Sequence, residues 1–295
     1  MILALLLAQA IFTPGPIVTP PPASPSPLSE RAAISQGLDE ANAKAKSIGG
    51  TLGAVVIDLQ TGSEADLNAD EPFPMQSVQK LPIAVFMYRA IDDGRFKANQ
   101  LITVTHADLV PYVSPVADAF ATRTSYSISE LLALMLEQSD NSAANVLLRL
   151  LGGADAVNAR LRSLDYAGIL IAPADAGYAK PATIAAFLSD LQAGKLMTVS
   201  SRASLLSLMS KSMTFPGRLR AGFPKGTLVE QKTGTSATTN GVTDATNDAG
   251  IVSVNGRTLI VVAMLHGARG SEAARDAVIA SVAGAAYDAV RAFPI

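Results

Sequence analysis

The stretch FPMQSVQKLPIAVFMYRAI, from Phe73 to Ile91, places a hydroxyl and an amine at the start of an otherwise apolar helical segment. On a helix, Ser77 and Lys80 occupy positions i and i+3, on one face and one turn apart. A lysine in that place can accept the serine's proton if burial or nearby positive charge lowers its pKa. The alternative is an ordinary helix start with a solvated lysine, and this motif alone does not decide between the two.

Two further polar motifs follow along the chain. Ser-Asp-Asn occupies 139–141 at the end of a predicted helix, and Lys-Thr-Gly occupies 232–234 on a predicted strand. Taken separately, they are typical of a turn between helices and of a solvent-facing edge strand. Each triplet is expected by chance in only about a few per cent of chains of this length. The ordered set of three therefore favours one shared active site.

Composition limits the classes of function. The chain has 295 residues, of which 49% are hydrophobic and 16% charged, enough for one large domain or two closely packed lobes. The net charge of −2, without a basic block, argues against nucleic acid as a partner. The absence of cysteine excludes thiol nucleophiles, disulfides and zinc fingers. The only histidines, His106 and His266, lack metal-ligand spacing, so we expect no metal and no cofactor.

The N-terminus has the character of an export signal. Residues 1–12, MILALLLAQAIF, are apolar but too short to span a bilayer as a helix. They resemble the core of a secretory signal, with small residues at 8–10 as a cleavage site, although no positive residues precede them. A retained membrane anchor is the alternative. Residues 13–27 are rich in proline and are expected to form an extended linker. We expect a protein exported to the periplasm or another extracytoplasmic space.

Strand patterns lie at both ends of the remaining chain, and helical patterns lie between them. This order predicts an α/β fold in which an antiparallel sheet is packed by terminal helices beside an all-helical lobe. Ser129, before Glu130, is a candidate helix cap, and the pair Asn255-Gly256 is a strong hairpin signal. The predicted helices are 28–47, a mostly helical block over 80–212, and 271–291; the predicted strands are 51–62, 226–236, 247–256 and 257–265.

The three ordered motifs resemble those of the class A β-lactamases and penicillin-binding proteins, and the class A β-lactamases in particular. The resemblance covers most of the chain from residue 28 onward. It implies a monomeric catalytic domain over 28–295 with a five-stranded antiparallel sheet. The α/β part would comprise about 28–76 and 213–295, and the helical lobe about 77–212. Segments similar to the family, in the same order, are 108–116, 139–153, 218–226 and 247–252.

The resemblance also implies roles for matching positions. Ser77 would be the nucleophile and Lys80 its base, and Ser139 would pass a proton to the leaving nitrogen. Asn141 would hold the side-chain amide of the substrate. The strand from Lys232 to Ser236 would be an exposed edge, with Lys232 and Thr233 at the substrate carboxylate. The whole set of expected residues is Ser77, Lys80, Ser139 and Lys232 for catalysis, and Asn141, Thr233, Gly234, Thr235 and Ser236 for binding, with the backbone N–H groups of Thr235 and Ser77 forming the oxyanion hole.

Two family features are missing. Class A enzymes hydrolyse their acyl-enzyme with a loop glutamate, yet residues 161–188 contain no glutamate and form a shorter loop. Of the acids between 141 and 181, Asp155 is expected at a helix start and Asp165 at a turn. Asp175 is the one candidate substitute base, with a plain turn residue as the alternative. Ala249 stands where the family carries an arginine.

These departures leave three functions open. The first is a β-lactam hydrolase that forms an acyl-Ser77 intermediate and deacylates slowly or with an unusual base, since losing a general base costs about 10²–10⁴-fold. The second is a D-Ala-D-Ala carboxypeptidase or transpeptidase acting on peptidoglycan stem peptides. The third is a β-lactam-binding sensor without turnover.

Overall fold

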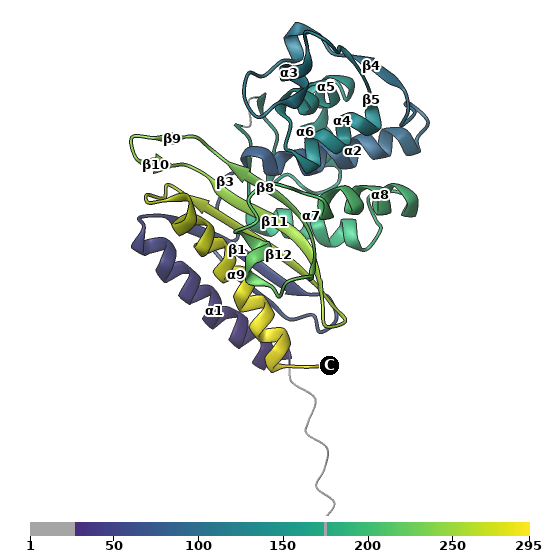
Figure 1. Cartoon of the computed structure of the whole chain (residues 1–295). Coiled ribbons are helices and arrows are strands. Elements are labelled where there is room, and N and C mark those ends of the chain that lie inside the picture. Colours follow the sequence, from purple (N-terminus) through teal and green to yellow (C-terminus); the bar gives the residue numbers. More distant parts are fainter. Residues whose placement is uncertain (1–26, 174–175) are drawn as a thin grey trace, which may run out of the picture.

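A five-stranded antiparallel sheet forms the centre of the computed structural model, which describes residues 27–173 and 176–295 (Figure 1). Its strand order is β2-β1-β12-β11-β8, so β8 lies at one edge. The Asn255-Gly256 hairpin joins β11 to β12, as expected. The strands are β1 (Thr51–Asp58), β2 (Glu64–Leu67), β8 (Leu228–Thr235), β11 (Thr246–Val254) and β12 (Arg257–His266).

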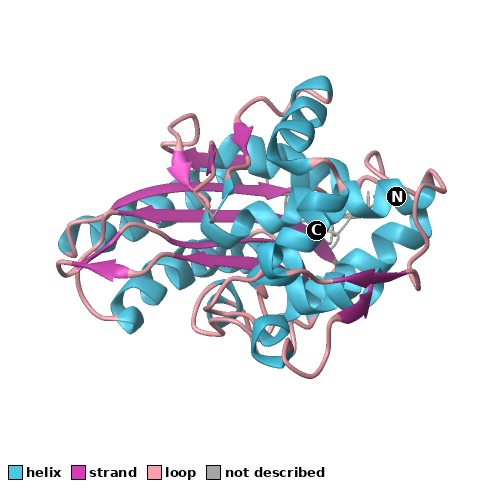
Figure 2. Ribbon diagram, turned by 90° about the horizontal axis from the view of Figure 1, so that it is seen from above, coloured by secondary structure: helices cyan, strands magenta, loops and turns pink. Residues whose placement is uncertain are grey.

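Helices cover both faces of this sheet (Figure 2). The terminal helices α1 (Pro27–Ser47) and α9 (Glu272–Ala292) pack side by side on one face, against a cluster that includes Leu52 and Val261. Alternate residues such as Val55 and Val262 point to the other face, where they meet α7 (Pro181–Gln192). This alternation follows from the two-residue period of a strand. The expected sheet with flanking terminal helices is confirmed.

The helical lobe sits beside the sheet, above it in Figure 1. Although α7 falls within the block expected for the lobe, it packs on the sheet. Short strand pairs accompany the helices. The lobe helices are α2 (Lys80–Asp92), α3 (Pro115–Ala119), α4 (Ile128–Glu137), α5 (Asn141–Leu150), α6 (Gly153–Ser163) and α8 (Val199–Ser210). The minor strands are β3 (Phe73–Pro74), β4 (Leu101–Thr103), β5 (Ser125–Ser127), β6 (Ile169–Leu170), β7 (Tyr178–Ala179), β9 (Thr238–Thr239) and β10 (Val242–Thr243).

The cap of α4 differs from expectation. Ser127, not Ser129, is the N-cap: its hydroxyl accepts a hydrogen bond from Glu130 N at 3.2 Å, and the Glu130 carboxylate accepts one from Ser127 N at 2.8 Å. A capping box needs its partners three residues apart, and only Ser127 has that spacing from Glu130. The helix therefore begins at Ile128.

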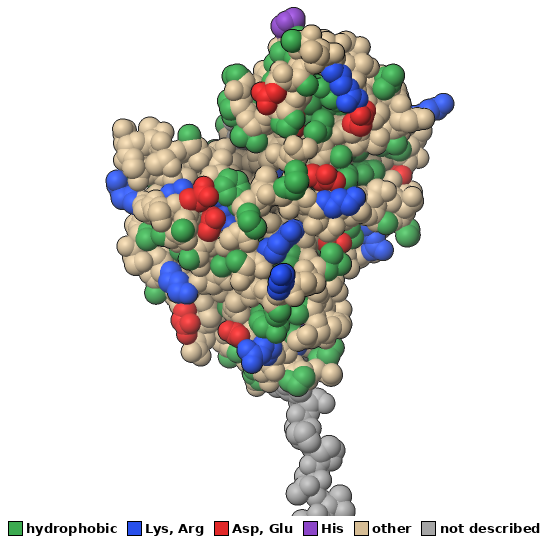
Figure 3. All heavy atoms as spheres, viewed as in Figure 1, with side chains coloured by type: hydrophobic (Ala, Val, Ile, Leu, Met, Phe, Trp, Pro, Cys, Tyr) green, Lys and Arg blue, Asp and Glu red, His purple; other side chains and the backbone are tan. Residues whose placement is uncertain are grey.

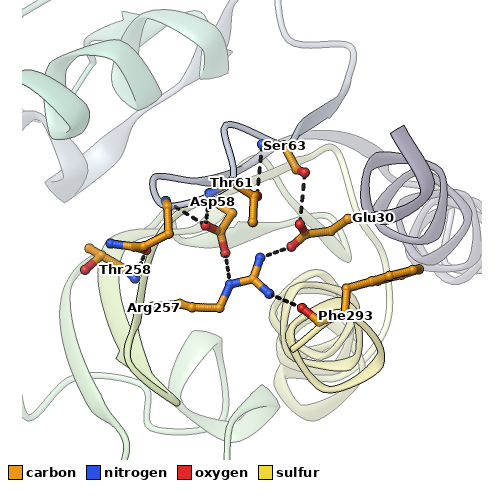
Figure 4. Close-up of polar contacts among 8 residues, drawn as sticks. Glu30, Asp58, Thr61, Ser63, Arg257, Thr258 and Phe293 are labelled. Carbon is orange, nitrogen blue, oxygen red and sulfur yellow. Dashed lines mark hydrogen bonds and ion pairs between the residues drawn. The ribbon is translucent and has the colours of Figure 1, made fainter. Parts of the chain in front are cut away.

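A buried arginine ties the two ends of the domain together (Figure 4). The Arg257 guanidinium donates to Asp58 at the end of β1, to Glu30 on α1 and to the Phe293 carbonyl after α9. Ser63 donates to the same Glu30 carboxylate at 2.9 Å. The three charged side chains are almost fully buried, so this cluster holds α1 and the end of α9 against the sheet by hydrogen bonds that are shielded from water.

Residues 1–26 lie outside the described residues, and so does the expected signal or anchor. The expected linker ran to residue 27, but Pro27 is the first residue of α1. Over the described ranges, no helix is both long and apolar enough to cross a membrane. In the view of Figure 3, positive and negative side chains are interspersed over the surface.

Candidate active site

The serine and lysine of the first motif lie at the junction of a turn and a helix. Ser77 belongs to a 3₁₀ turn, η1 (Gln76–Gln79), and α2 begins at Lys80. The helix start predicted at Ser77 is therefore a tighter turn that leads into α2. Lys80 Nζ lies 2.8 Å from Ser77 Oγ, and the lysine is fully buried. The amine is thus within direct proton-transfer distance of the hydroxyl.

The Ser-Asp-Asn motif forms the turn between α4 and α5. Lys80 Nζ donates to the Ser139 carbonyl at 2.7 Å and to Asn141 Oδ1 at 2.5 Å, and lies 3.2 Å from Ser139 Oγ. Asp140 faces away from this cluster and caps α5 by accepting from Ala143 N at 2.8 Å. Ser139 adopts a φ of 61°, a region that costs strain for a non-glycine residue. The capped turn holds that backbone, which aims both Ser139 and Asn141 at Lys80.

The Lys-Thr-Gly motif lies on β8 and reaches the same cluster. Lys232 Nζ donates to Ser139 Oγ at 3.0 Å and to the Thr233 carbonyl at 2.8 Å. The Ser139 hydroxyl therefore lies between the amines of Lys80 and Lys232, a geometry suited to proton relay. The side chains of Ser77, Lys80, Ser139 and Lys232 thus form one cluster, although Lys232 lies 93 residues from Ser139 in the chain.

The edge strand is less exposed than expected. Lys232 and Thr233 are buried, and only Thr235 and Ser236, at the end of the motif, are partly open. Gly234 packs against the turn that carries the serine: a Cβ there would lie 2.4 Å from the Met75 carbonyl oxygen. The sheet edge and η1 can approach this closely only because residue 234 has no side chain.

An arginine that the sequence analysis did not single out reaches this strand. Arg218, fully buried, donates to Thr235 Oγ1 at 2.7 Å and to Asp276 on α9 at 2.7 Å. It approaches from the segment between α8 and β8, whereas Ala249, at the expected arginine position, is buried on β11. Arg218 lies in the family-like segment 218–226, but its reach to Thr235 depends on the folded chain.

A buried acid lies beside the same strand. Asp248 pairs with Thr233 in the register of β11 and β8, and it accepts from Leu219 N at 3.2 Å. Burial raises the pKa of Asp248 to about 7, against the opposing effect of Arg218 and Lys232. The α9 side of the strand therefore carries a carboxyl group that titrates near neutral pH.

A small recess adjoins the cluster at Asn141. It offers about 20 Å³ to the centre of a water molecule, which is room for one ordered water. Gln79 closes it by pairing with both backbone groups of Ala172, at 3.1 and 3.2 Å. The described lining contains amides and apolar groups and no carboxylate: Gln79, Ile83, Val110, Tyr112, Asn141, Ala144, Asn145, Leu148, Ala172 and Pro173.

Of the three candidate acids, the two that the structure describes, Asp155 and Asp165, do not line this recess. Asp155 lies in the first turn of α6, and Asp165 forms the turn after that helix with a φ of 65°, as their sequence contexts indicate. Asp175, the candidate substitute base, lies outside the described residues. Across 27–173 and 176–295, no three His, Asp or Glu side chains gather closely enough to hold a metal ion.

The cluster combines a hydroxyl within reach of a buried amine, a second hydroxyl between two amines, and a cationic strand edge. Such an arrangement can transfer an acyl group to serine and protonate a leaving nitrogen. Ser77 and Lys80 supply the first part, and Ser139 with Lys80 and Lys232 supplies the second. Lys232 and Arg218 give the strand edge its positive charge.

Comparisons with known proteins agree with this chemistry. The model of the β-lactamase enzyme family matches residues 36–290. The chain is 29% identical to β-lactamase VEB-1 of Pseudomonas aeruginosa, over 79% of this chain and 83% of the relative. A crystal structure of a β-lactamase from Chitinophaga pinensis superposes with a TM-score of 0.82 at 30% identity, over 86% of this chain and 99% of that chain. An ancestral class A β-lactamase superposes with a TM-score of 0.78 at 33% identity, over 87% and 99% of the respective chains.

Proposed function

Because the chain belongs to the β-lactamase enzyme family, we propose that it is a hydrolase that opens the amide bond of β-lactams through an ester on Ser77. The observation that carries this proposal is the 2.8 Å contact between Ser77 Oγ and the buried Lys80 amine. The likeness to class A β-lactamases supports the proposal, and such hydrolysis would confer resistance to β-lactam antibiotics.

Acylation follows from the cluster. In its neutral form, Lys80 Nζ accepts the Ser77 proton while Oγ attacks the β-lactam carbonyl carbon. The ring C–N bond then breaks as the nitrogen takes a proton from Ser139 Oγ, which regains one from the protonated Lys80 Nζ at 3.2 Å; Lys232 Nζ lies 3.0 Å from the same oxygen. Backbone N–H groups of Ser77 and Thr235 hold the oxyanion.

Substrate binding uses the edge of β8 and the turn before α5. Lys232 and Thr233 attract the substrate carboxylate, with Arg218 orienting the Thr235 hydroxyl and adding positive potential. Asn141 holds the substrate's side-chain amide. The partial exposure of Thr235 and Ser236 makes the end of this strand the part that a substrate can reach.

Deacylation is the slow step in this proposal. The recess beside Asn141 has room for a water but presents no carboxylate among its described lining residues. Without a positioned base, the barrier to hydrolysis of the ester rises by about 3–5 kcal/mol. Asp175 is the remaining candidate for a substitute base.

The same observation favours a second candidate activity. A D-Ala-D-Ala carboxypeptidase or transpeptidase that acts on peptidoglycan stem peptides also forms an acyl-serine, and it needs no dedicated carboxylate for β-lactam turnover. If the ester does not turn over at all, the protein is a β-lactam-binding sensor.

Mass spectrometry after mixing with a penicillin tests the proposal. We expect a covalent adduct on the wild type and none on Ser77→Ala; an equal adduct on both proteins would refute it. The adduct lifetime then separates the activities: seconds or less indicates a β-lactamase, and many minutes indicates a penicillin-binding protein. Release of D-Ala from a stem-peptide mimic is the positive test for the peptidase.

Export and a monomeric catalytic domain over 28–295 complete the proposal, with residues 1–12 as the signal. N-terminal sequencing of the exported protein checks this: a mature chain that starts after residue 10 supports a cleaved signal, and a retained Met1 supports an anchor.

A further inference from the structure

The turn that carries the nucleophile has a strained backbone. Gln76, directly before Ser77, has a φ of 50°. A non-glycine residue in this region persists only where its surroundings hold it there. The direction of the Ser77 N–H and of its hydroxyl depends on this conformation, because both follow Gln76 directly in the chain.

One side-chain amide from the sheet holds the two residues before Gln76. Asn247 Nδ2 donates to the Pro74 carbonyl at 2.8 Å and to the Met75 carbonyl at 3.1 Å. Asn247 is almost fully buried on β11, more than 170 residues away in the chain. A buried amide that bridges successive carbonyls fixes the orientation of both peptide groups that lead into the strained residue.

The position of Asn247 in the sheet links this turn to the substrate strand. In the register of β11 and β8, Asn247 lies opposite Gly234, whose ideal Cβ would be 3.1 Å from Ser77 N. Arg218 donates to the Asn247 carbonyl at 2.9 Å, which ties the same residue to the group that holds Thr235. Asn247 therefore connects both sides of the proposed oxyanion hole.

We propose that Asn247 is a positioning residue whose side-chain amide holds the strained turn so that the Ser77 N–H and hydroxyl face the reacting carbonyl. The inference rests on the proposed role of Ser77. The Asn247 amide donates to the Pro74 and Met75 carbonyls and would act on the reaction only through them. Because removing one oxyanion donor costs about 10²–10³-fold, partial misalignment of the turn should slow acylation by about 10- to 100-fold.

The first experiment compares two nearly isosteric substitutions on β11. Asn247→Leu removes the amide, and Thr246→Val removes a neighbouring buried hydroxyl that makes no hydrogen bond within the described residues. We expect single-turnover acylation by a chromogenic cephalosporin to slow by about 10- to 100-fold in Asn247→Leu and by less than threefold in Thr246→Val. A single-turnover rate constant does not depend on the folded fraction, so partial unfolding would lower only the amplitude.

Two further measurements separate positioning from general destabilisation. The infrared carbonyl stretch of the acyl-enzyme should gain a band at higher frequency in Asn247→Leu, because a misplaced N–H polarises the ester less. Gln76→Gly, which tolerates positive φ without strain, should reduce the acylation defect of Asn247→Leu when the two are combined.

An Asn247→Leu variant that acylates at the wild-type rate with an unchanged carbonyl band would overturn the inference, as would equal slowing by Thr246→Val. Those results leave the proposed function intact if Ser77→Ala forms no adduct. An adduct on Ser77→Ala would instead refute the proposed function itself.

Discussion

Replacing Arg218 by alanine tests whether the buried guanidinium supports both the fold and the carboxylate end of the site. Four hydrogen bonds would be lost, to Asp276, the Gly234 carbonyl, the Asn247 carbonyl and Thr235 Oγ1. The stacking of the guanidinium on the Phe215 ring, at 3.9 Å, would go with them.

The magnitude follows from burial. The side chain of Arg218 is 0% exposed and that of Asp276 is 12% exposed, so the variant leaves a carboxylate with little water to solvate it. Removing one partner of a buried pair costs about 3–5 kcal/mol. In a domain of this size that loss lowers the melting temperature by about 6–20 °C. Removing both partners, as Arg218→Ala with Asp276→Ala, should recover part of it, because no unpaired charge remains.

Thermal denaturation of the two single variants and the double variant measures the first effect. For the effect on substrate binding, we expect the KM of Arg218→Ala for a penicillin to rise by about tenfold, while its rate on a β-lactam ester without a free carboxylate stays unchanged. An Arg218→Ala protein with the wild-type melting temperature, or one that loses activity equally on both substrates, would show that this reasoning is wrong.

Three other substitutions probe the recess beside Asn141, the buried carboxyl group of Asp248, and the cluster of Arg257, Glu30 and Asp58. Gln79→Glu introduces a carboxylate into the recess beside Asn141, and we expect the lifetime of the penicilloyl adduct to become at least tenfold shorter. If the lifetime instead changes in Asp175→Asn, Asp175 is the base. For Asp248, the folded-state pKa of about 7 lies above the unfolded value, so between about pH 4 and 7 the unfolded carboxyl loses its proton while the folded one keeps it, and the stability of the fold decreases over that range. The melting temperature of Asp248→Asn should therefore exceed that of the wild type by more at pH 8 than at pH 5, and a pH-independent difference would contradict the assignment. Arg257→Met leaves the buried carboxylates of Glu30 and Asp58 without their cationic partner, and urea denaturation should show that the free energy of unfolding falls by about 3–5 kcal/mol. A fall below about 1 kcal/mol would show that the Arg257 cluster contributes little to stability.

Local patterns in the sequence were enough for the elements and for most of the chemistry. Strand alternation, the Asn255-Gly256 turn and helical periodicity predict the sheet and its flanking helices, because these signals act over a few residues. The same holds for the identity of the reacting groups, since a hydroxyl and an amine at Ser77 and Lys80 need only one helical turn to meet. The cap of α4 is also a local feature, because the three-residue spacing that a capping box requires selects Ser127, and not Ser129, as the partner of Glu130.

Tertiary structure decided which groups meet in the active-site cluster and what supports them. Ser139 meets amines 59 and 93 residues away, and Asn247 binds carbonyls more than 170 residues distant. Arg218 reaches Thr235 from a segment other than the one in which the family carries its arginine. Such contacts depend on how the lobe and the sheet pack as whole bodies and on the direction in which each long side chain leaves its backbone. Residue order determines which chemical groups are available, whereas packing determines which of them come within hydrogen-bonding distance. A slip of β8 by one residue, for example, would turn the Lys232 side chain to the other face of the sheet, away from Ser139.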